Sequence, residues 1–225
     1  MSRSEKPYYA AYEERYRAVH ARGLQWSSRE PTPVVMETVR SLGLSRDARI
    51  LEIGCGEGRD ARAVLAAGFD LLATDLSPEA VAYCRGIMPE SAAHFAVLDV
   101  LNGGLDGGFD LIYAVAVIHM LVRDEDRDGF YRFIRRHLAP GGHALICSMG
   151  DGVAEMQSDV NEAFELRERE HVSGKMLLPA TSCRMVSFPV FRAELARAGL
   201  TVQREGLTAS PPDFDRMMFA LVTAD

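Results

Sequence analysis

The feature that most constrains the fold of this chain is a short apolar segment followed at once by alternating glycines. Arg49–Ile53 is expected to form a strand, and Gly54, Gly56 and Gly58 precede a stretch with helical spacing over Asp60–Ala67. Glycine has no Cβ and accepts positive φ, so the backbone can turn sharply and approach a ligand. The free N–H groups at the start of the next helix suit a polar ligand. This order predicts a strand, a nucleotide-type binding turn and a helix.

The spacing of the glycines separates this turn from the dinucleotide-binding fingerprint. That fingerprint, G-x-G-x-x-G, needs a glycine where Arg59 stands. The turn instead has the spacing G-x-G-x-G, and Glu52 lies two residues before the first glycine. Many α/β proteins pass from a strand to a helix through a glycine turn, so the function depends on the rest of the chain.

Short apolar runs alternate with amphipathic stretches up to Met149, which is typical of parallel strands joined by crossover helices. The nearly unbroken apolar run Phe109–Val117 predicts a strand that is buried on both faces. The other expected strands are Arg49–Ile53, Leu71–Thr74, His94–Leu98 and His143–Met149, and the expected helices are Pro33–Leu42, Asp60–Ala67, Pro78–Met88 and Asp126–Leu138.

The pattern changes after Met149. One long polar helix is expected over Val153–His171, and residues 150–187 are too many for a simple crossover, so we expect an inserted lid. The last expected elements are a helix over Phe188–Ala198 and strands over Thr201–Glu205 and Met217–Thr223, with a long connection that contains Pro211 and Pro212.

The length of 225 residues and a hydrophobic content of 48% fit one α/β domain. We expect residues 1–48 to form an N-terminal helical addition, 49–149 the cofactor-binding core, 150–187 the lid or substrate insertion, and 188–225 a C-terminal helix and strand pair.

Charge and composition exclude several classes of function. No apolar run is long enough to span a bilayer and the first residues are polar, so we expect a cytoplasmic protein without a membrane partner. The formal net charge of −7 opposes broad binding to nucleic acid. The four cysteines lack C-x-x-C spacing, so we expect neither disulfides nor a metal site.

Acidic residues follow the second and third expected strands. Asp75 ends the second strand and precedes Leu76, and Asp99 and Val100 follow the third. Ligands of open α/β sheets bind at the carboxyl edge, near the point where the strand order reverses. Asp75 is therefore expected to accept hydrogen bonds from ribose hydroxyls, and Asp99 and the Val100 N–H are expected to meet an adenine ring.

Taken in order, these motifs resemble those of the class I S-adenosylmethionine-dependent methyltransferases. The resemblance covers residues 45–150 and resumes more loosely from Phe188. The matching residues are Glu52, Gly54, Gly56 and Gly58 for the first motif, Asp75 and Asp99 for the acids that hold ribose and adenine, Phe109–Ile112 for the fourth motif, and Leu138–Gly142 for the approach to strand five.

The resemblance implies a three-layer α/β fold. Its sheet has seven mostly parallel strands with an antiparallel last strand, and helices cover both faces, with an N-terminal helical cap and an insertion after strand five. It also implies S-adenosylmethionine as cofactor, S-adenosylhomocysteine as product, and methyl transfer to an O, N or S atom of a small molecule by a monomer or homodimer. The implied cofactor contacts are Glu52, Gly54, Gly56, Gly58, Asp75, Leu76, Asp99, Val100 and Val115.

His119 is the candidate catalytic base, because it follows the fourth expected strand at the carboxyl edge. Histidine can accept a proton near neutral pH. An aliphatic alcohol acceptor would need a base, whereas a thiol ionises easily. The alternative is a histidine that only packs or hydrogen-bonds at the edge of the cofactor.

The candidate substrate contacts come from the two additions to the core. Tyr8, Tyr12 and Tyr16 fall at i, i+4 and i+8 and are expected to share one helix face. One interpretation is that this face and Trp26 close over a sulfonium cation, because aromatic rings attract cations. The alternative is that they only pack the helix on the sheet.

The insertion supplies two further candidates. Met149 is expected to open a mobile turn into the lid. Arg184 either pairs with an anionic group of the substrate or forms a salt bridge to the acidic lid helix.

Two other functions remain open. A catalytically silent S-adenosylmethionine-binding module predicts a closed pocket beside His119. A nicotinamide-dependent oxidoreductase would share the sheet and the ribose acid, but Arg59 and the antiparallel last strand argue against it. The methyl acceptor is not identified by the sequence.

Overall fold

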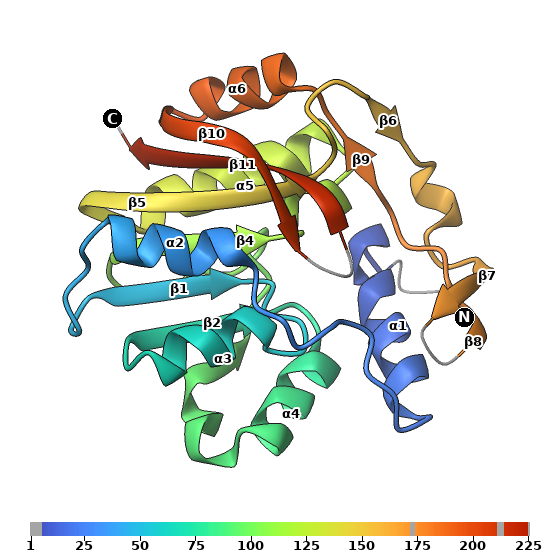
Figure 1. Cartoon of the computed structure of the whole chain (residues 1–225). Helices are drawn as coiled ribbons and strands as arrows, with labels where there is room; N and C mark the ends of the chain where they lie inside the picture. The colour runs from blue at the N-terminus through green and yellow to red at the C-terminus, as the bar shows by residue number, and fades with distance from the viewer. Residues whose placement is uncertain (1–5, 172–173, 211–213, 225) are drawn as a thin grey trace.

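The computed structural model describes residues 6–171, 174–210 and 214–224. Its centre is a seven-stranded sheet with the strand order β10-β11-β5-β4-β1-β2-β3 (Figure 1). Strands β1 to β5 are parallel, and β11 is antiparallel to both of its neighbours, which confirms the predicted sheet. The strands are β1 Arg49–Ile53, β2 Asp70–Asp75, β3 Phe95–Val97, β4 Phe109–Val115, β5 Leu138–Met149, β10 Leu200–Ser210 and β11 Phe214–Ala224.

Helices cover both faces of this sheet, as predicted. Successive strand residues point to opposite faces, so β4 packs on both sides. Its Leu111 and Tyr113 pack in a core with α2, α3 and α4, and its Ile112 and Ala114 pack in a second core with α5 and α6. The helices are α2 Pro33–Ser41, α3 Arg59–Ala66, α4 Pro78–Ile87, α5 Asp124–His137 and α6 Phe188–Arg197.

The insertion after β5 contains strands where one long helix was expected. The predicted helix over Val153–His171 is wrong, although its Glu and Arg residues favour helix locally. Apolar residues at helical spacing stop at Phe164, and the following segment pairs with a strand whose Met176 and Leu178 are buried. Burial of those side chains decides the conformation. The elements are β6 Met156–Gln157, a 3₁₀ turn Val160–Glu162, β7 Leu166–His171, β8 Gly174–Pro179 and β9 Arg184–Met185.

The last two strands are longer than predicted. They extend to Ser210 and from Phe214, so the expected long connection between them is wrong. Pro211 and Pro212 lie outside the described residues. Strand β10 lies at the edge of the described sheet and is partly exposed, which explains why the apolar pattern predicted only its first half.

The N-terminal addition contributes α1, Ala11–His20, which begins after a 3₁₀ turn over Tyr8–Ala10. The helix lies beside the carboxyl ends of the central strands, next to the β7–β8 hairpin (Figure 1). Val19 of α1 packs with Met176 and Leu178 of β8. The two additions therefore meet each other above the sheet edge. Among the described helices, none is long and apolar enough to cross a membrane.

Candidate functional site

Two adjoining pockets lie at the carboxyl edge of the sheet, next to the point between β1 and β4 where the strand order reverses. They share Tyr12, Tyr16, Gly54 and Met120 among their lining residues. The first pocket lies against the ends of β2 and β3, and the second is a larger cavity of about 710 Å³ between the end of β4, α1 and the insertion.

The glycine turn has a backbone that only glycine adopts without strain. Gly54 has a φ of 74°, and a Cβ there would lie 2.3 Å from Cγ2 of Val117. Gly56 has a φ of 53°, and its Cβ would lie 2.8 Å from the Tyr16 hydroxyl. The Gly54 N–H donates to the Thr74 carbonyl at 2.7 Å, which ties the turn to β2. The turn therefore runs closely between β4 and α1.

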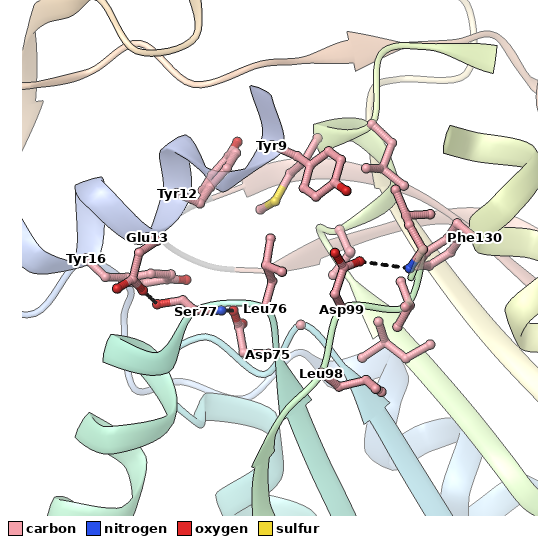
Figure 2. A pocket seen from close by; sticks show the side chains of 17 residues that line it. Tyr9, Tyr12, Glu13, Tyr16, Asp75, Leu76, Ser77, Leu98, Asp99 and Phe130 are labelled. Atoms are coloured by element: carbon pink, nitrogen blue, oxygen red, sulfur yellow. Dashed lines mark hydrogen bonds between the residues drawn. The ribbon is translucent and has the colours of Figure 1, made fainter. Parts of the chain in front are cut away.

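Asp75 connects the glycine turn to the end of β2. Its Oδ2 accepts from the Gly56 N–H and its Oδ1 from the Ser77 N–H, both at 2.8 Å. Burial, with a further contribution from the charge of Glu13, raises the pKa of Asp75, and the two N–H donors oppose that shift. Each carboxylate oxygen keeps a further lone pair for a ligand hydroxyl. Figure 2 shows this carboxylate beside Leu76 in the first pocket.

Asp99 and Val100 line the other end of the first pocket. The Asp99 carboxylate accepts from the Leu101 N–H at 2.9 Å and from the Asn102 side-chain amide at 2.8 Å, so its orientation is fixed. Tyr9 lies across the pocket from it (Figure 2). The structure thus brings together both predicted acids.

Glu52 lies at the second pocket with one carboxylate oxygen unpaired. The residue is 3% exposed, and no described residue hydrogen-bonds to its Oε2. Burial, and then the charge of Asp60, raise the pKa of Glu52 well above its usual range. An orphaned buried carboxylate oxygen fits a cationic group of a bound ligand. Val115, another predicted contact, lines the same cavity.

His119 lies in the second pocket on a short 3₁₀ turn, Ile118–Met120. It is buried, and its Nδ1 has no hydrogen-bond partner within the described chain. Burial lowers its pKa to about 4, and the positive charges of Arg127 and Arg15 add to the effect. The imidazole is therefore neutral at physiological pH, and its Nδ1 is free to form a hydrogen bond.

Arg127 holds the backbone on both sides of His119. Its Nη1 donates to the carbonyls of Ile118 at 2.9 Å and Leu121 at 3.2 Å. Its Nε and Nη2 bind both carboxylate oxygens of Glu194, at 2.8 and 2.6 Å. This buried bidentate pair links α5 to α6 and fixes the turn that carries the histidine.

Four of the six predicted substrate residues line the second pocket: Tyr12, Tyr16, Trp26 and Met149. Tyr8 does not line either pocket. It precedes α1, and its hydroxyl donates to Asp126 at 2.6 Å and accepts from the Val122 N–H at 2.9 Å. The prediction that three tyrosines share one helix face is therefore wrong for Tyr8, whose hydrogen bonds anchor the turn before the helix.

Arg184 is also held away from the pockets. Its Nη1 binds the Asp124 carboxylate at 2.6 Å and the Val122 carbonyl at 2.8 Å. The predicted lid helix does not exist, so the expected salt bridge to it is replaced by this ion pair with the start of α5. Arg184 does not line the cavity that the substrate prediction requires.

Several site residues were missed from the sequence. Tyr9 lines the first pocket because α1 begins later than the tyrosine spacing suggests. Glu57, inside the glycine run, accepts from the Trp26 N–H at 2.7 Å, and His20 bridges Glu57 and Glu79 at 2.8 and 2.9 Å. These bonds fasten α1 to the glycine turn. In the sequence, the signal for this role was the position of an acidic residue, Glu57, between two glycines.

Comparison with known sequences identifies the core of the chain. The family described as "Methyltransferase domain" matches residues 51–144. The biotin biosynthesis bifunctional protein BioCD of Bordetella avium is 29% identical over 126 residues, 55% of this chain and 26% of that protein. The 2-heptyl-1-hydroxyquinolin-4(1H)-one methyltransferase of Mycobacteroides abscessus is 28% identical over 125 residues, 54% of each. The matches thus span about half or less of these relatives.

Solved structures share the fold across most of the chain. The CcbJ methyltransferase from Streptomyces caelestis superposes with a TM-score of 0.68 at 15% identity and covers 94% of this chain and 98% of its own. The glycopeptide N-methyltransferase MtfA, complexed with sinefungin, gives a TM-score of 0.66 at 20% identity, with 88% of each chain covered. The fold is that of the class I S-adenosylmethionine-dependent methyltransferases. Within this fold, residues 51–144 match the methyltransferase-domain family.

Proposed function

We propose that this chain binds S-adenosylmethionine and transfers its methyl group to a small-molecule acceptor. The observation that carries the proposal is the order of groups along the sheet edge. Asp99 follows β3, Asp75 ends β2 and Glu52 is the last residue but one of β1, and these three strands are adjacent. The three acids extend from the first pocket to the cavity that His119 lines. The family match supports the same activity, as do MtfA structures that contain S-adenosylmethionine and S-adenosylhomocysteine.

In this proposal, different residues of the chain bind different parts of the cofactor. Asp75 accepts from the ribose hydroxyls, and Asp99 with the Val100 N–H holds the adenine. Glu52 and the Gly54 turn take the amino-acid end, where the unpaired Oε2 receives a positive charge. Further contacts come from Gly56, Gly58, Leu76 and Val115. When bound, the cofactor supplies a methyl group on a positively charged sulfur.

Tyr12 and Tyr16 cover the boundary between the two pockets and exclude water from it. Their aromatic faces suit a sulfonium. The acceptor atom bonds to the methyl carbon as the carbon–sulfur bond breaks, and the acceptor's proton goes to His119 or to water. With a pKa of about 4, His119 is a weak base, which favours acceptors that ionise readily, such as thiols or phenols, over aliphatic alcohols.

The cavity favours an enzyme over a silent binding module. A silent module predicts a closed pocket beside His119, whereas the cavity there has a volume of about 710 Å³. A nicotinamide-dependent oxidoreductase is opposed by Arg59 in the glycine turn and by the antiparallel β11. We further propose a monomer or homodimer with no nucleic-acid partner, which the net charge of −7 supports, and a cytoplasmic location, which the four free cysteines support.

A transfer assay tests this function. The purified protein is incubated with S-adenosylmethionine labelled on the methyl group and with fractionated bacterial metabolites, and the label is followed by chromatography. Label should appear in a small-molecule product, together with S-adenosylhomocysteine. Tight cofactor binding with no labelled product from any fraction would favour the silent module instead.

A further inference from the structure

Arg15 of α1 is a buried cation in the wall of the second pocket. The residue is only 7% exposed. Its Nη2 donates to the carbonyls of Pro179 and Ala180, both at 3.0 Å, and to Oγ1 of Thr181 at 2.7 Å. Its Nε has no hydrogen-bond partner among the residues described. The guanidinium of this cavity-lining residue therefore has an unused hydrogen-bond donor.

Among the described residues, no carboxylate forms an ion pair with Arg15. Burial lowers the pKa of Arg15, and the ionisable groups that act on it are Tyr12, Arg169 and Tyr16. Arg169 is a second cation, lines the same cavity and donates to the same Ala180 carbonyl at 3.1 Å. A buried cation with only neutral acceptors and a like charge nearby is unfavourable unless an anion joins it.

Two acidic residues of the same cavity, Glu57 and Asp60, have partners other than Arg15. Glu57 accepts from Trp26 and from His20, and the Asp60 carboxylate accepts from the N–H and hydroxyl of Thr32 at 2.6 and 3.0 Å. These carboxylates hold His20, Trp26 and Thr32 to the glycine turn and to the start of α3. They do not neutralise Arg15.

The backbone around Arg15 is strained. Thr181 is β-branched, yet its φ is 60°, in the left-handed region that such residues avoid. Ala116, which lines the same cavity at the end of β4, has a φ of 58°. Strain of this kind persists only where the surroundings fix it, and it concentrates at ligand sites. The bond from Arg15 to Thr181 is part of what fixes it.

We propose that Arg15, backed by Arg169, binds an anionic oxygen group of the methyl acceptor, such as a carboxylate. The inference rests on the proposed function, because it names the substrate class of that cavity. His119 lines the same cavity, so the proposal places the anion site and the candidate base in one cavity. Arg184, the cation expected from the sequence to do this, is bound to Asp124 instead.

The only tryptophan of the chain reports on this site. The Arg15 guanidinium carbon lies 4.7 Å from the ring centroid of Trp26, so ligands that bind Arg15 should change the intrinsic fluorescence. The protein is saturated with S-adenosylhomocysteine, which already supplies the cofactor's carboxylate, and is titrated with benzoate and with the neutral analogue benzamide. Benzoate should bind at least tenfold more tightly. Arg15→Met and Arg169→Met should reduce this preference.

Arg17→Met is the matched control, because Arg17 lies on the same helix with a side chain that is 61% exposed. It should keep the preference for benzoate. Equal affinities for benzoate and benzamide in the unmodified protein would overturn the inference, whether or not the variants fold. A second outcome would also overturn the inference. In it, a folded Arg15→Met variant keeps the preference for benzoate but binds S-adenosylhomocysteine tenfold more weakly. That result would assign Arg15 to the cofactor's carboxylate.

The two proposals fail in different ways. Binding of S-adenosylhomocysteine is measured first by calorimetry, and its absence counts against the methyltransferase function. The benzoate and benzamide titrations are repeated without S-adenosylhomocysteine, so that the anion site is decided in either case.

Discussion

Asp75 has two roles at the scale of a single residue. Its carboxylate holds the N–H groups of Gly56 and Ser77, and thereby joins the glycine turn to the end of β2. The same carboxylate faces the pocket proposed for the ribose. A change at Asp75 therefore acts on the ligand and on the loop that receives it.

Asp75→Asn should weaken binding of S-adenosylhomocysteine by about 10- to 100-fold. The amide has one acceptor oxygen where the carboxylate has two, and a hydrogen bond to a charged group contributes about 1.5–3 kcal/mol. Isothermal titration calorimetry measures the change. Asp70→Asn is the control, because Asp70 is exposed at the other end of β2. Equal affinities of the two variants would contradict the role of Asp75.

His119 gives a pH signature that does not require a known acceptor. Its pKa of about 4 in the folded protein lies below the usual value near 6.5, so the unfolded chain binds the proton first as the pH falls. Stability from the neutral histidine is complete above the unfolded pKa and is lost as the pH falls towards 4.

Between about pH 7.5 and pH 5, the free energy of unfolding of the unmodified protein should fall by about 2 kcal/mol more than that of His119→Gln. Glutamine keeps a polar side chain and does not titrate. Urea unfolding at the two pH values measures the difference. Parallel losses in both proteins would show that His119 is not buried in its neutral form.

At the scale of secondary-structure elements, the Arg127–Glu194 pair joins α5, α6 and the turn that carries His119. Both side chains are buried. Such a pair adds little net stability compared with apolar residues of the same size, but removal of one partner leaves an uncompensated charge.

Arg127→Met should therefore lower the free energy of unfolding by about 3–5 kcal/mol, and the double change Arg127→Met, Glu194→Met should recover much of that loss. Urea unfolding of the three proteins tests this. Arg132→Met, on an exposed position of α5, should have little effect. A double variant less stable than Arg127→Met would contradict the explanation.

Elements with strong local patterns were predictable. Strand β4 is buried on both faces and is apolar almost throughout, and α4 begins at Pro78 after Ser77, whose hydroxyl accepts from the Ala80 N–H at 3.0 Å. The segment Leu166–His171 was not predictable, because its strand conformation depends on pairing with β8 and on burial of Met176 against α1. The contact of β8 with α1 joins Met176 to Val19, which are far apart in the sequence, and such a contact leaves no local pattern.

The site divides in the same way. Asp75 and Asp99 follow strands, so their meeting at one sheet edge follows from the topology. The roles of Arg15 and Arg184 could not be assigned from sequence spacing. The position of each side chain depends on a partner more than 50 residues away, which is Thr181 for Arg15 and Asp124 for Arg184.

At the scale of the whole molecule, the carboxyl edge of the core sheet forms one side of the two pockets. Two segments that are far apart in the sequence form the other side. Helix α1 and the β7–β8 hairpin pack against each other through Val19 and Leu178 (Figure 1). The first pocket, which we propose for the cofactor, is lined mainly by core residues, whereas more than half of the residues that line the second pocket come from the two additions. We therefore expect the identity of the acceptor to depend on these additions rather than on the family motifs.

The central claim is that the glycine turn and the two acids form a site for S-adenosylmethionine. Isothermal titration of the purified protein with S-adenosylmethionine, S-adenosylhomocysteine and NAD tests it most directly. We predict one-site binding of both sulfur nucleotides and no heat with NAD. Binding of NAD without binding of S-adenosylhomocysteine would contradict the account.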